Sequence, residues 1–243
     1  MQIATWNLNN RVGKVRFRPE AASAAIALSA DVLVFNEYYP QKHETEFSDI
    51  LRRAGWSHQA MSRYTGEKAN RVLIASRLAL RPLEIPLPDF DRQFPSNLVC
   101  VETATTGIAI IGVRVPWYEK KDIGLVINAW DWLEATGATL ANKPAIILGD
   151  LNVALNSTRA RGGEHFRRIL QAGWQRATPK DAHSFFGAHG QNSEIDHILV
   201  TQRCHLNNPH YVIKLDGHLF AGGTEALSDH AALLADVTVR DSQ

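Results

Sequence analysis

Short apolar runs alternate along the chain with segments whose apolar residues recur at helical spacing. Continuous apolar runs are typical of buried strands, and the helical period is typical of helices that pack on one face. Helices are predicted at 20–30, 43–54, 123 to about 137 and 164–172, and the third of these is expected to end near Gly137. Strands are predicted at 3–6, 32–35, 72–75, 98–103, 108–115, 144–148, 194–200, 211–214 and 232–239. This alternation indicates an α/β or α+β domain with helices outside the sheets.

The sequence predicts a single domain over residues 1–243. No repeat, low-complexity tract or Gly/Ser/Pro-rich linker divides it. A chain of 243 residues can bury roughly 70% of its unfolded surface, so a stable core is expected without disulfides or a structural metal.

Composition narrows the class of protein further. The 26 Lys and Arg residues nearly balance 25 Asp and Glu residues, so the formal net charge of +1 excludes a protein that coats nucleic acid or anionic membrane by charge alone. Cys100 and Cys204 form no disulfide framework and suit a reducing compartment. The N-terminus has neither a basic region nor an apolar core typical of a signal peptide, and no run approaches a membrane span. A soluble, cytoplasmic protein is therefore expected, most simply a monomer.

Several predicted strands end or begin with carboxylates, amides or histidine. In layered α/β proteins, ligands collect at strand ends, because loops there present polar groups while the sheet holds them rigid. Extended residues two positions apart point to one side, so Asn7 with Asn9, and Asp150 with Asn152, are each expected to aim at one point. Taken singly, each of these motifs is also compatible with a turn or a cap.

The combination of these motifs resembles the endonuclease/exonuclease/phosphatase (DNase I-like) family over residues 3 to about 238. The resemblance rests on Thr5-Trp6-Asn7, Glu37, Arg71 to Arg77, Gly149-Asp150-Leu151-Asn152, Ile195-Asp196-His197-Ile198 and Ser228-Asp229-His230. It implies a four-layer α/β sandwich, in which two packed mixed β-sheets are flanked by helices, with one site across the top of the sheets. It also implies hydrolysis of a phosphate ester by in-line water attack, assisted by Mg²⁺ or Mn²⁺.

The resemblance assigns the metal to Glu37 and Asp229. Both are carboxylates, and a hard cation such as Mg²⁺ prefers oxygen ligands and keeps several waters. Where many family members carry an acid after the first strand, this chain has Asn9, which offers an oxygen without a charge. A weaker metal site, or reliance on Glu37 and Asp229, is expected to follow. Asp229 and His230 are neighbours in an extended segment, so their side chains are expected to diverge, one to the metal and one to the phosphate.

The resemblance also implies five catalytic roles. Asp150 orients or deprotonates the attacking water, and Asn152 holds the phosphate and that carboxylate in register. Asn7 helps to position the metal and phosphate. His230 donates a hydrogen bond to a phosphoryl oxygen, and Asp196 holds its far nitrogen, which fixes the tautomer and favours the charged form.

Arg114 is a departure from the family, which usually has Tyr or His near that strand end. A guanidinium there could bind the phosphate in a bidentate fashion and stabilise developing charge. The alternative is a structural ion pair with a nearby carboxylate.

Basic and aromatic residues follow three of the motif-bearing segments, which favours a polyanionic partner. They are Arg11, Lys14, Arg16 and Arg18; Trp117, Tyr118, Lys120 and Lys121; and Arg159, Arg161, Arg167 and Arg168. Basic side chains would contact flanking phosphates, and aromatic rings could stack on bases. The leading hypothesis is therefore a nuclease acting on DNA or RNA. A phosphatase or phosphodiesterase for a small-molecule or lipid-like phosphate ester is the alternative, and a binding protein without activity is a third, less consistent with the full set of site residues.

Overall fold

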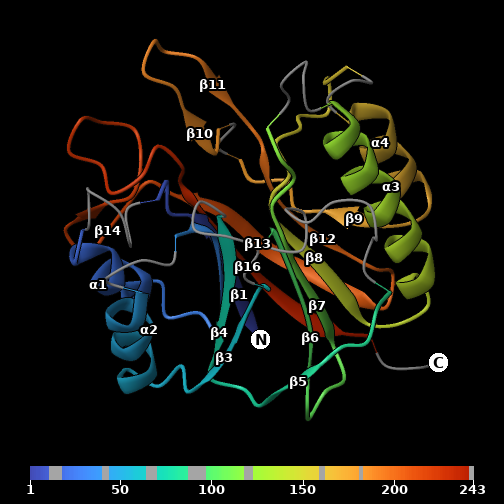
Figure 1. The fold of residues 1–243 in the computed structure, drawn as a ribbon, viewed down its shortest axis with the longest axis horizontal. Helices are drawn as coiled ribbons and strands as arrows, with labels where there is room; N and C mark the ends of the chain where they lie inside the picture. Colours follow the sequence, from blue (N-terminus) through green and yellow to red (C-terminus); the bar gives the residue numbers. More distant parts are fainter. Residues whose placement is uncertain are drawn as a thin grey trace.

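The computed structural model describes residues 1–10, 18–39, 44–63, 70–86, 97–117, 123–158, 162–180 and 183–240. These residues form two six-stranded sheets that pack face to face, with two helices on the outer face of each (Figure 1). The predicted four-layer arrangement is thus confirmed.

The first sheet has the strand order β13-β16-β1-β2-β4-β3. Its strands are β1 (Gln2–Asn7), β2 (Val32–Tyr38), β3 (His58–Met61), β4 (Arg71–Ser76), β13 (Cys204–Val212) and β16 (Ala232–Val239). The pair β1 and β2 is parallel and the other pairs are antiparallel, so this is a mixed sheet.

The second sheet has the order β5-β6-β7-β8-β12-β9. Its strands are β5 (Leu80–Pro82), β6 (Leu98–Thr103), β7 (Ala109–Val113), β8 (Ala145–Asp150), β9 (Gln175–Arg176) and β12 (Asp196–Val200). Here β7 and β8 are the parallel pair. Two short hairpins complete the strands, β10 (Phe185–Phe186) with β11 (Asn192–Ser193), and β14 (Lys214–Leu215) with β15 (His218–Leu219).

The central strands are buried on both faces, which creates three apolar layers. Between the sheets, Val34 and Ile74 of the first sheet pack with Ile110 and Leu148 of the second. Gly112 lies at this interface, where a Cβ atom would approach Val34 Cγ1 to 3.0 Å, so a glycine here lets the two sheets come together.

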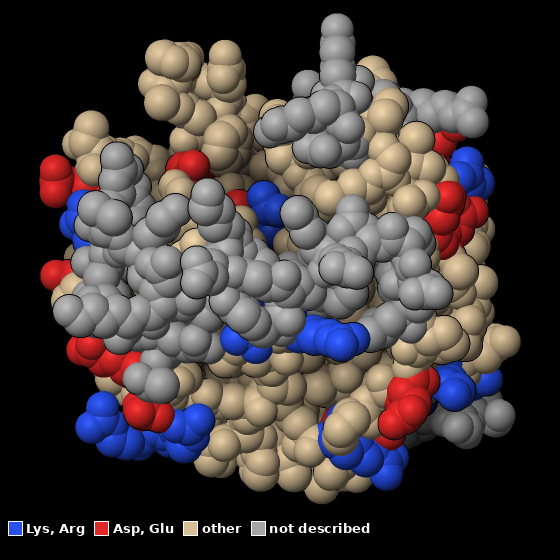
Figure 2. Space-filling model, viewed as in Figure 1, with Lys and Arg blue, Asp and Glu red and all other residues tan. Residues whose placement is uncertain are grey.

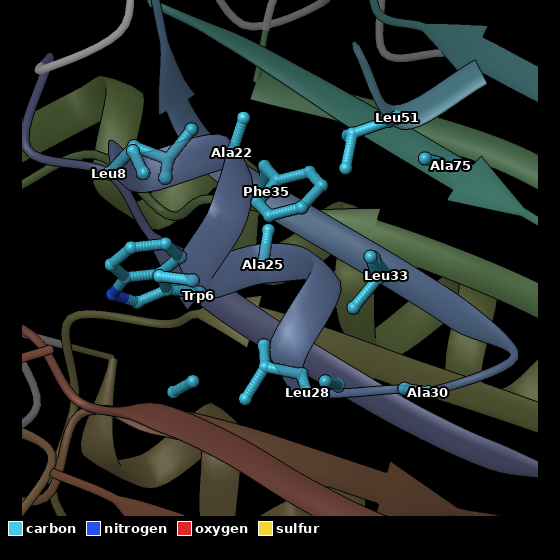
Figure 3. Packing of buried hydrophobic residues seen from close by; sticks show 14 of the residues in the cluster. Trp6, Leu8, Ala22, Ala25, Leu28, Ala30, Leu33, Phe35, Leu51 and Ala75 are labelled. Carbon is cyan, nitrogen blue, oxygen red and sulfur yellow. The ribbon is translucent and has the colours of Figure 1, made fainter. Parts of the chain in front are cut away.

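The outer layers lie under the helices. Helices α1 (Glu20–Ala27) and α2 (Glu44–Arg53) cover the first sheet, and α3 (Ile123–Leu140) and α4 (Gly163–Gln171) cover the second (Figure 1). In Figure 3 the small side chains of Ala22 and Ala25 on α1 lie beside Phe35, with Trp6 and Leu33 in the same cluster. Alanine on this face allows α1 to lie close to the sheet.

The predicted end of helix α3 is wrong. Helix α3 does not stop near Gly137 but continues to Leu140, with Gly137 buried in its last turns. The Trp174 indole explains this position, because it donates a hydrogen bond to the Gly137 carbonyl at 3.2 Å and would contact a Cβ there at 3.4 Å. The glycine serves packing between helix and loop. Cys100 and Cys204 are both free thiols, as expected.

Candidate active site

The predicted site residues gather at one edge of the two sheets, where strand ends from both sheets meet. Strand register explains this meeting, because Asn7 pairs with Asn36 at the ends of β1 and β2, and Asp150 pairs with Asp196 between β8 and β12. A cavity of about 250 Å³ opens there. Its lining includes seven of the nine predicted residues: Asn9, Glu37, Arg114, Asp150, Asn152, Asp229 and His230. Asn7 and Asp196, both fully buried, lie behind it.

Asp150 is held by amide groups on several sides. Asn7 Nδ2 donates to Asp150 Oδ2 at 2.9 Å, and the backbone N–H of Asn152 donates to Oδ1 at 3.0 Å. Asn152 Nδ2 lies 3.2 Å from Oδ2 and also donates to the Val115 carbonyl at 2.7 Å. The backbone N–H of Asp150 donates to Asn36 Oδ1 at 2.9 Å, which connects the two sheets. The Asp150 carboxylate is therefore fixed in orientation.

Unusual backbone conformations accompany these side chains. Gly149 has φ 144°, and a Cβ atom there would lie 1.9 Å from the Val113 carbonyl, so only glycine fits before Asp150. Asn9, Glu37 and Asn152 all have positive φ, at 46°, 51° and 49°. Asparagine tolerates this region, whereas a glutamate in it is uncommon. Such conformations cluster at functional sites, because the surrounding structure must hold them.

Burial strongly perturbs the Asp150 carboxyl. Loss of water around the side chain and the nearby charge of Asp196 raise its pKa to about 7, despite the opposing influence of His230 and Arg114. A carboxyl group with a pKa near neutrality is suited to accept a proton at physiological pH.

His230 is fixed from both sides. Its Nδ1 donates to Asp196 Oδ2 at 2.7 Å, and its backbone N–H donates to Ser228 Oγ at 3.1 Å. The Ser228 hydroxyl in turn donates to the Asn7 carbonyl at 2.7 Å, and the Trp6 indole N–H donates to the His230 carbonyl at 2.9 Å. The end of β1 thus holds the segment that carries the histidine.

The protonation state of His230 follows from Asp196. Burial by itself lowers the pKa of His230, but the negative charge of Asp196 and its hydrogen bond outweigh that effect and raise the pKa to about 10. With Nδ1 committed to Asp196, Nε2 is the nitrogen left to face the cavity. The predicted divergence of Asp229 and His230 is wrong in part, because both side chains line the cavity and Asp229 Oδ1 lies 3.8 Å from Nε2. Burial also raises the pKa of Asp229.

Glu37 and Arg114 form an ion pair across the two sheets. Arg114 Nη2 lies 3.0 Å and Nε 3.1 Å from Glu37 Oε1, and both side chains are only 15% exposed. Arg114 Nε is also 4.0 Å from Asp150 Oδ2. Asn10 Nδ2 donates to Glu37 Oε2 at 2.9 Å. The ion pair considered as the alternative for Arg114 is therefore present, and the guanidinium nevertheless lines the cavity.

The donor set fits a hard divalent cation. The cavity and the residues directly behind it contain more carboxyl groups than cationic side chains, so negative charge is in excess when all are ionised. The carboxyl groups are those of Glu37, Asp150, Asp196 and Asp229, and the cationic side chains are Arg114 and His230. Within the described residues, no three Asp, Glu, His or Cys side chains form a ready metal cluster. Mg²⁺ needs only one or two carboxylates, because it keeps several waters. Glu37, Asp229 and the Asn9 amide are the oxygen donors that line the cavity.

The predicted basic clusters are described only in part. Arg11, Lys14, Arg16, Tyr118, Lys120, Lys121, Arg159 and Arg161 lie outside the described residues. Arg167 donates to the carbonyls of Leu155 and Ser157, and Arg168 pairs with Glu134 at 2.9 Å, so these two arginines hold α4 against its surroundings. On the face seen in Figure 2, the coloured basic and acidic side chains are interspersed.

Sequence reasoning missed three residues of the site. Asn36 links Asp150 to the Val113 carbonyl, which its Nδ2 reaches at 3.2 Å, and Asn10 contacts Glu37. Both lie directly beside recognised motifs, and their amide side chains were the available signal. Phe185 lines the cavity with its ring centroid 5.1 Å from that of His230, and nothing in its sequence context indicates this position.

His197, within a recognised motif, has a structural position instead. It is buried beside Phe166, with ring centroids 4.7 Å apart, and its Nε2 donates to the Val153 carbonyl at 2.7 Å. Burial lowers the pKa of His197, so the ring is held neutral. This contact anchors the chain directly after Asn152.

The chain is similar to a known protein family over most of its length. The sequence profile of the Endonuclease/Exonuclease/phosphatase family matches residues 4–230. The comparison with curated protein sequences found no match. No helix in the described part of the chain has the length and apolar character needed to cross a membrane.

Three solved structures show the same fold. An AP endonuclease from Archaeoglobus fulgidus is 20% identical with a TM-score of 0.74, covering 98% of this chain and 100% of that one. A 3' phosphatase from Neisseria, bound to a product DNA hairpin, is 19% identical with a TM-score of 0.76, covering 97% and 98%. An endonuclease/exonuclease/phosphatase from Beutenbergia cavernae is 16% identical with a TM-score of 0.72, covering 98% and 71%.

Proposed function

The chain belongs to the Endonuclease/Exonuclease/phosphatase family, and on that basis we propose that it is a divalent-metal-dependent nuclease that hydrolyses nucleic-acid phosphodiester bonds. Family membership supports a phosphoric ester hydrolase. The observation that carries the finer proposal is one cavity that combines a buried carboxyl of raised pKa, a cationic histidine and oxygen donors for a cation.

Asp150 is proposed to position and deprotonate the attacking water. Its pKa near 7 lets it accept a proton at neutral pH, and the amides of Asn7 and Asn152 keep its oxygens in place. Asn7 acts from behind the carboxylate. Asn152, on the cavity surface, is proposed to contact the phosphate as well.

His230 is proposed to donate from Nε2 to a phosphoryl oxygen. The Asp196 carboxylate keeps the imidazole protonated and fixes its orientation, so no reorganisation is needed when charge develops on the phosphate. Arg114 supplies a second positive charge near Asp150, with Nε 4.0 Å from Oδ2. Together they place donors around the position where a phosphoryl group would be held.

Glu37 and Asp229, with the Asn9 amide, are proposed to hold Mg²⁺ or Mn²⁺. When bound, the cation would neutralise charge on the phosphoryl group and polarise its oxygens. The amide at Asn9 lowers the charge of this donor set relative to a third carboxylate, so a modest affinity for the metal is expected.

Aromatic groups at the cavity support a nucleic-acid substrate. Trp117 is 48% exposed at the rim, and Phe185 lies beside His230, so both are placed for stacking on a base. The fold is shared with an AP endonuclease and with a 3' phosphatase solved with product DNA. The alternative, a small or lipid-like phosphate ester, is favoured by the engagement of Arg167 and Arg168 within the protein.

A substrate panel separates these functions. The purified protein is incubated with Mg²⁺ or Mn²⁺ and with single- and double-stranded DNA, RNA and small phosphate esters, with and without a chelator. Chelator-sensitive cleavage of nucleic acid is expected, and Asp150→Asn should abolish it. Asp131→Asn, an exposed position on α3, is the matched control and should retain activity. Hydrolysis of small esters alone would select the alternative, and no hydrolysis of any phosphodiester would refute the nuclease.

A further inference from the structure

Both carboxylate oxygens of Glu37 already have partners within the protein. Oε1 accepts a hydrogen bond from Arg114 Nε at 3.1 Å and lies 3.0 Å from Arg114 Nη2. Oε2 accepts a hydrogen bond from the Asn10 amide at 2.9 Å. Because Arg114 has a permanent charge, it neutralises Glu37 without any metal. A divalent cation that binds this carboxylate must therefore compete with a guanidinium.

Arg114 lies where a ligand in the cavity could change its contact with Glu37. It follows β7 on the second sheet, where its backbone N–H donates to the Asn97 carbonyl at 2.8 Å, and its side chain reaches Glu37 on the first sheet. The guanidinium also lies near Asp150, with Nε 4.0 Å from Oδ2. It thus stands between the carboxylate proposed for the metal and the carboxylate proposed for the water.

A phosphoryl group in the cavity would offer Arg114 a better partner. Guanidinium binds phosphate oxygens in a bidentate fashion, whereas here its two nitrogens share a single oxygen of Glu37. Contact with the phosphate would draw Arg114 away from Glu37 and expose Oε1. The freed oxygen would then be available to the cation.

We propose that Arg114 couples metal binding to phosphate binding by exchanging the Glu37 carboxylate for a phosphoryl group. The proposal rests on the proposed metal-dependent function and extends it: Arg114 keeps metal affinity low until phosphate arrives, and then binds the phosphoryl group itself. Because coupling between two ligands is reciprocal, each must strengthen binding of the other by the same factor.

The test measures Mn²⁺ binding by electron paramagnetic resonance of the free ion, with and without methylphosphonate. This probe carries a phosphoryl group and has no ester bond to hydrolyse. For the wild type, methylphosphonate should tighten Mn²⁺ binding. Arg114→Gln should bind Mn²⁺ about fivefold more tightly than the wild type in the absence of methylphosphonate, and its coupling factor should be about fivefold smaller, because one competing charge is gone.

Two further variants check the interpretation. Arg114→Lys keeps the positive charge but can approach Glu37 with only one nitrogen, that of its ammonium group. Its Mn²⁺ affinity should therefore fall between those of the wild type and Arg114→Gln. Arg81→Gln removes the same charge from β5, where Arg81 pairs with Glu102 and is 58% exposed, and should behave as the wild type. Glu37→Gln should weaken Mn²⁺ binding in every background.

The outcomes separate the coupling from the function on which it rests. Unchanged or weaker Mn²⁺ binding in both Arg114 variants, or an equal coupling factor in the wild type and Arg114→Gln, would overturn the coupling and leave a metal-dependent enzyme. Full Mn²⁺ binding by Glu37→Gln would also overturn it, because the metal would then lie elsewhere. A wild type that binds no Mn²⁺ even with methylphosphonate would overturn both.

Discussion

Replacing Asp196 with asparagine should remove the charge that keeps His230 protonated. Asp196 is fully buried, and its Oδ2 is 2.7 Å from His230 Nδ1. An asparagine oxygen can still accept this hydrogen bond, so the geometry is kept while the negative charge is lost. Burial would then dominate, and the pKa of His230 should fall from about 10 towards or below the ordinary value of 6.5.

The size of the effect follows from the two pKa values. A change from about 10 to about 6.5 corresponds to about 5 kcal/mol of preference for the imidazolium form. Because the folded-state pKa is raised, this stabilisation is fully present below pH 6.5 and is lost as the pH rises through about 10. The variant should therefore be less stable than the wild type at pH 6, and the difference should shrink as the pH rises towards 10.

The assay combines a proton NMR titration of His230 with urea unfolding at pH 6 and pH 9.5, in the presence of a chelator. The chain has ten histidines, so a His230→Gln spectrum identifies the signal. Asp236→Asn is the matched control, because Asp236 accepts hydrogen bonds from Gln2 and Asn208 away from the cavity. The variant should also lose about 100-fold in turnover, since a neutral ring with Nδ1 protonated cannot donate from Nε2.

Two results would contradict this reasoning. If His230 in Asp196→Asn still titrates above pH 9, Asp196 is not the source of its positive charge. If the loss of unfolding free energy is the same at pH 6 and pH 9.5, the effect of the substitution is packing and not electrostatics.

Three further substitutions test the rest of the site. Asp150→Asn should reduce turnover by about 100-fold or more, and unchanged turnover would contradict the role of Asp150. The stability of this variant relative to the wild type should rise between pH 4 and pH 7, because burial raises the folded-state pKa of Asp150 and makes its ionisation costly in the wild type. Gly149→Ala should lower the unfolding free energy by about 3 kcal/mol or prevent folding, since a Cβ atom would meet the Val113 carbonyl at 1.9 Å; a melting temperature equal to the wild type would contradict the strain. Asn36→Ala should cost about 3 kcal/mol in urea unfolding, because two buried hydrogen bonds are lost, and a loss below about 0.5 kcal/mol would show that water replaces them.

The central strands were predictable from the sequence because they are buried on both faces. Strands β1, β2, β4 and β8 appear as continuous apolar runs, and each was found within a few residues of its bounds. The edge strands β3 and β5 were missed, as was the first part of β13. These strands have polar or exposed positions, so their sequences lack the apolar pattern that identifies a strand.

The site was predictable as a set of residues but not as a set of contacts. Strand-end polarity pointed to Asp150 and His230, and family resemblance supplied their roles. The ion pair of Glu37 with Arg114 joins two sheets and residues 77 positions apart, so it depends on how the sheets pack. Phe185 reaches the cavity through a short hairpin, which has no pattern that marks it as part of a site.

The register of the second sheet brings two carboxyl groups together, and the other charged residues of the site lie around them. It places Asp150 directly opposite Asp196, and like charges opposite each other on neighbouring strands are unfavourable. His230, which precedes β16, neutralises Asp196, and Arg114 lies near Asp150, but Glu37 and Asp229 leave negative charge in excess. A raised pKa at Asp150 lets the protein without metal relieve part of this excess by binding a proton. A divalent cation would relieve it instead, and would leave Asp150 ionised to act on water. The near-neutral chain thus contains a local excess of negative charge suited to a cation, beside two positive groups suited to a phosphate.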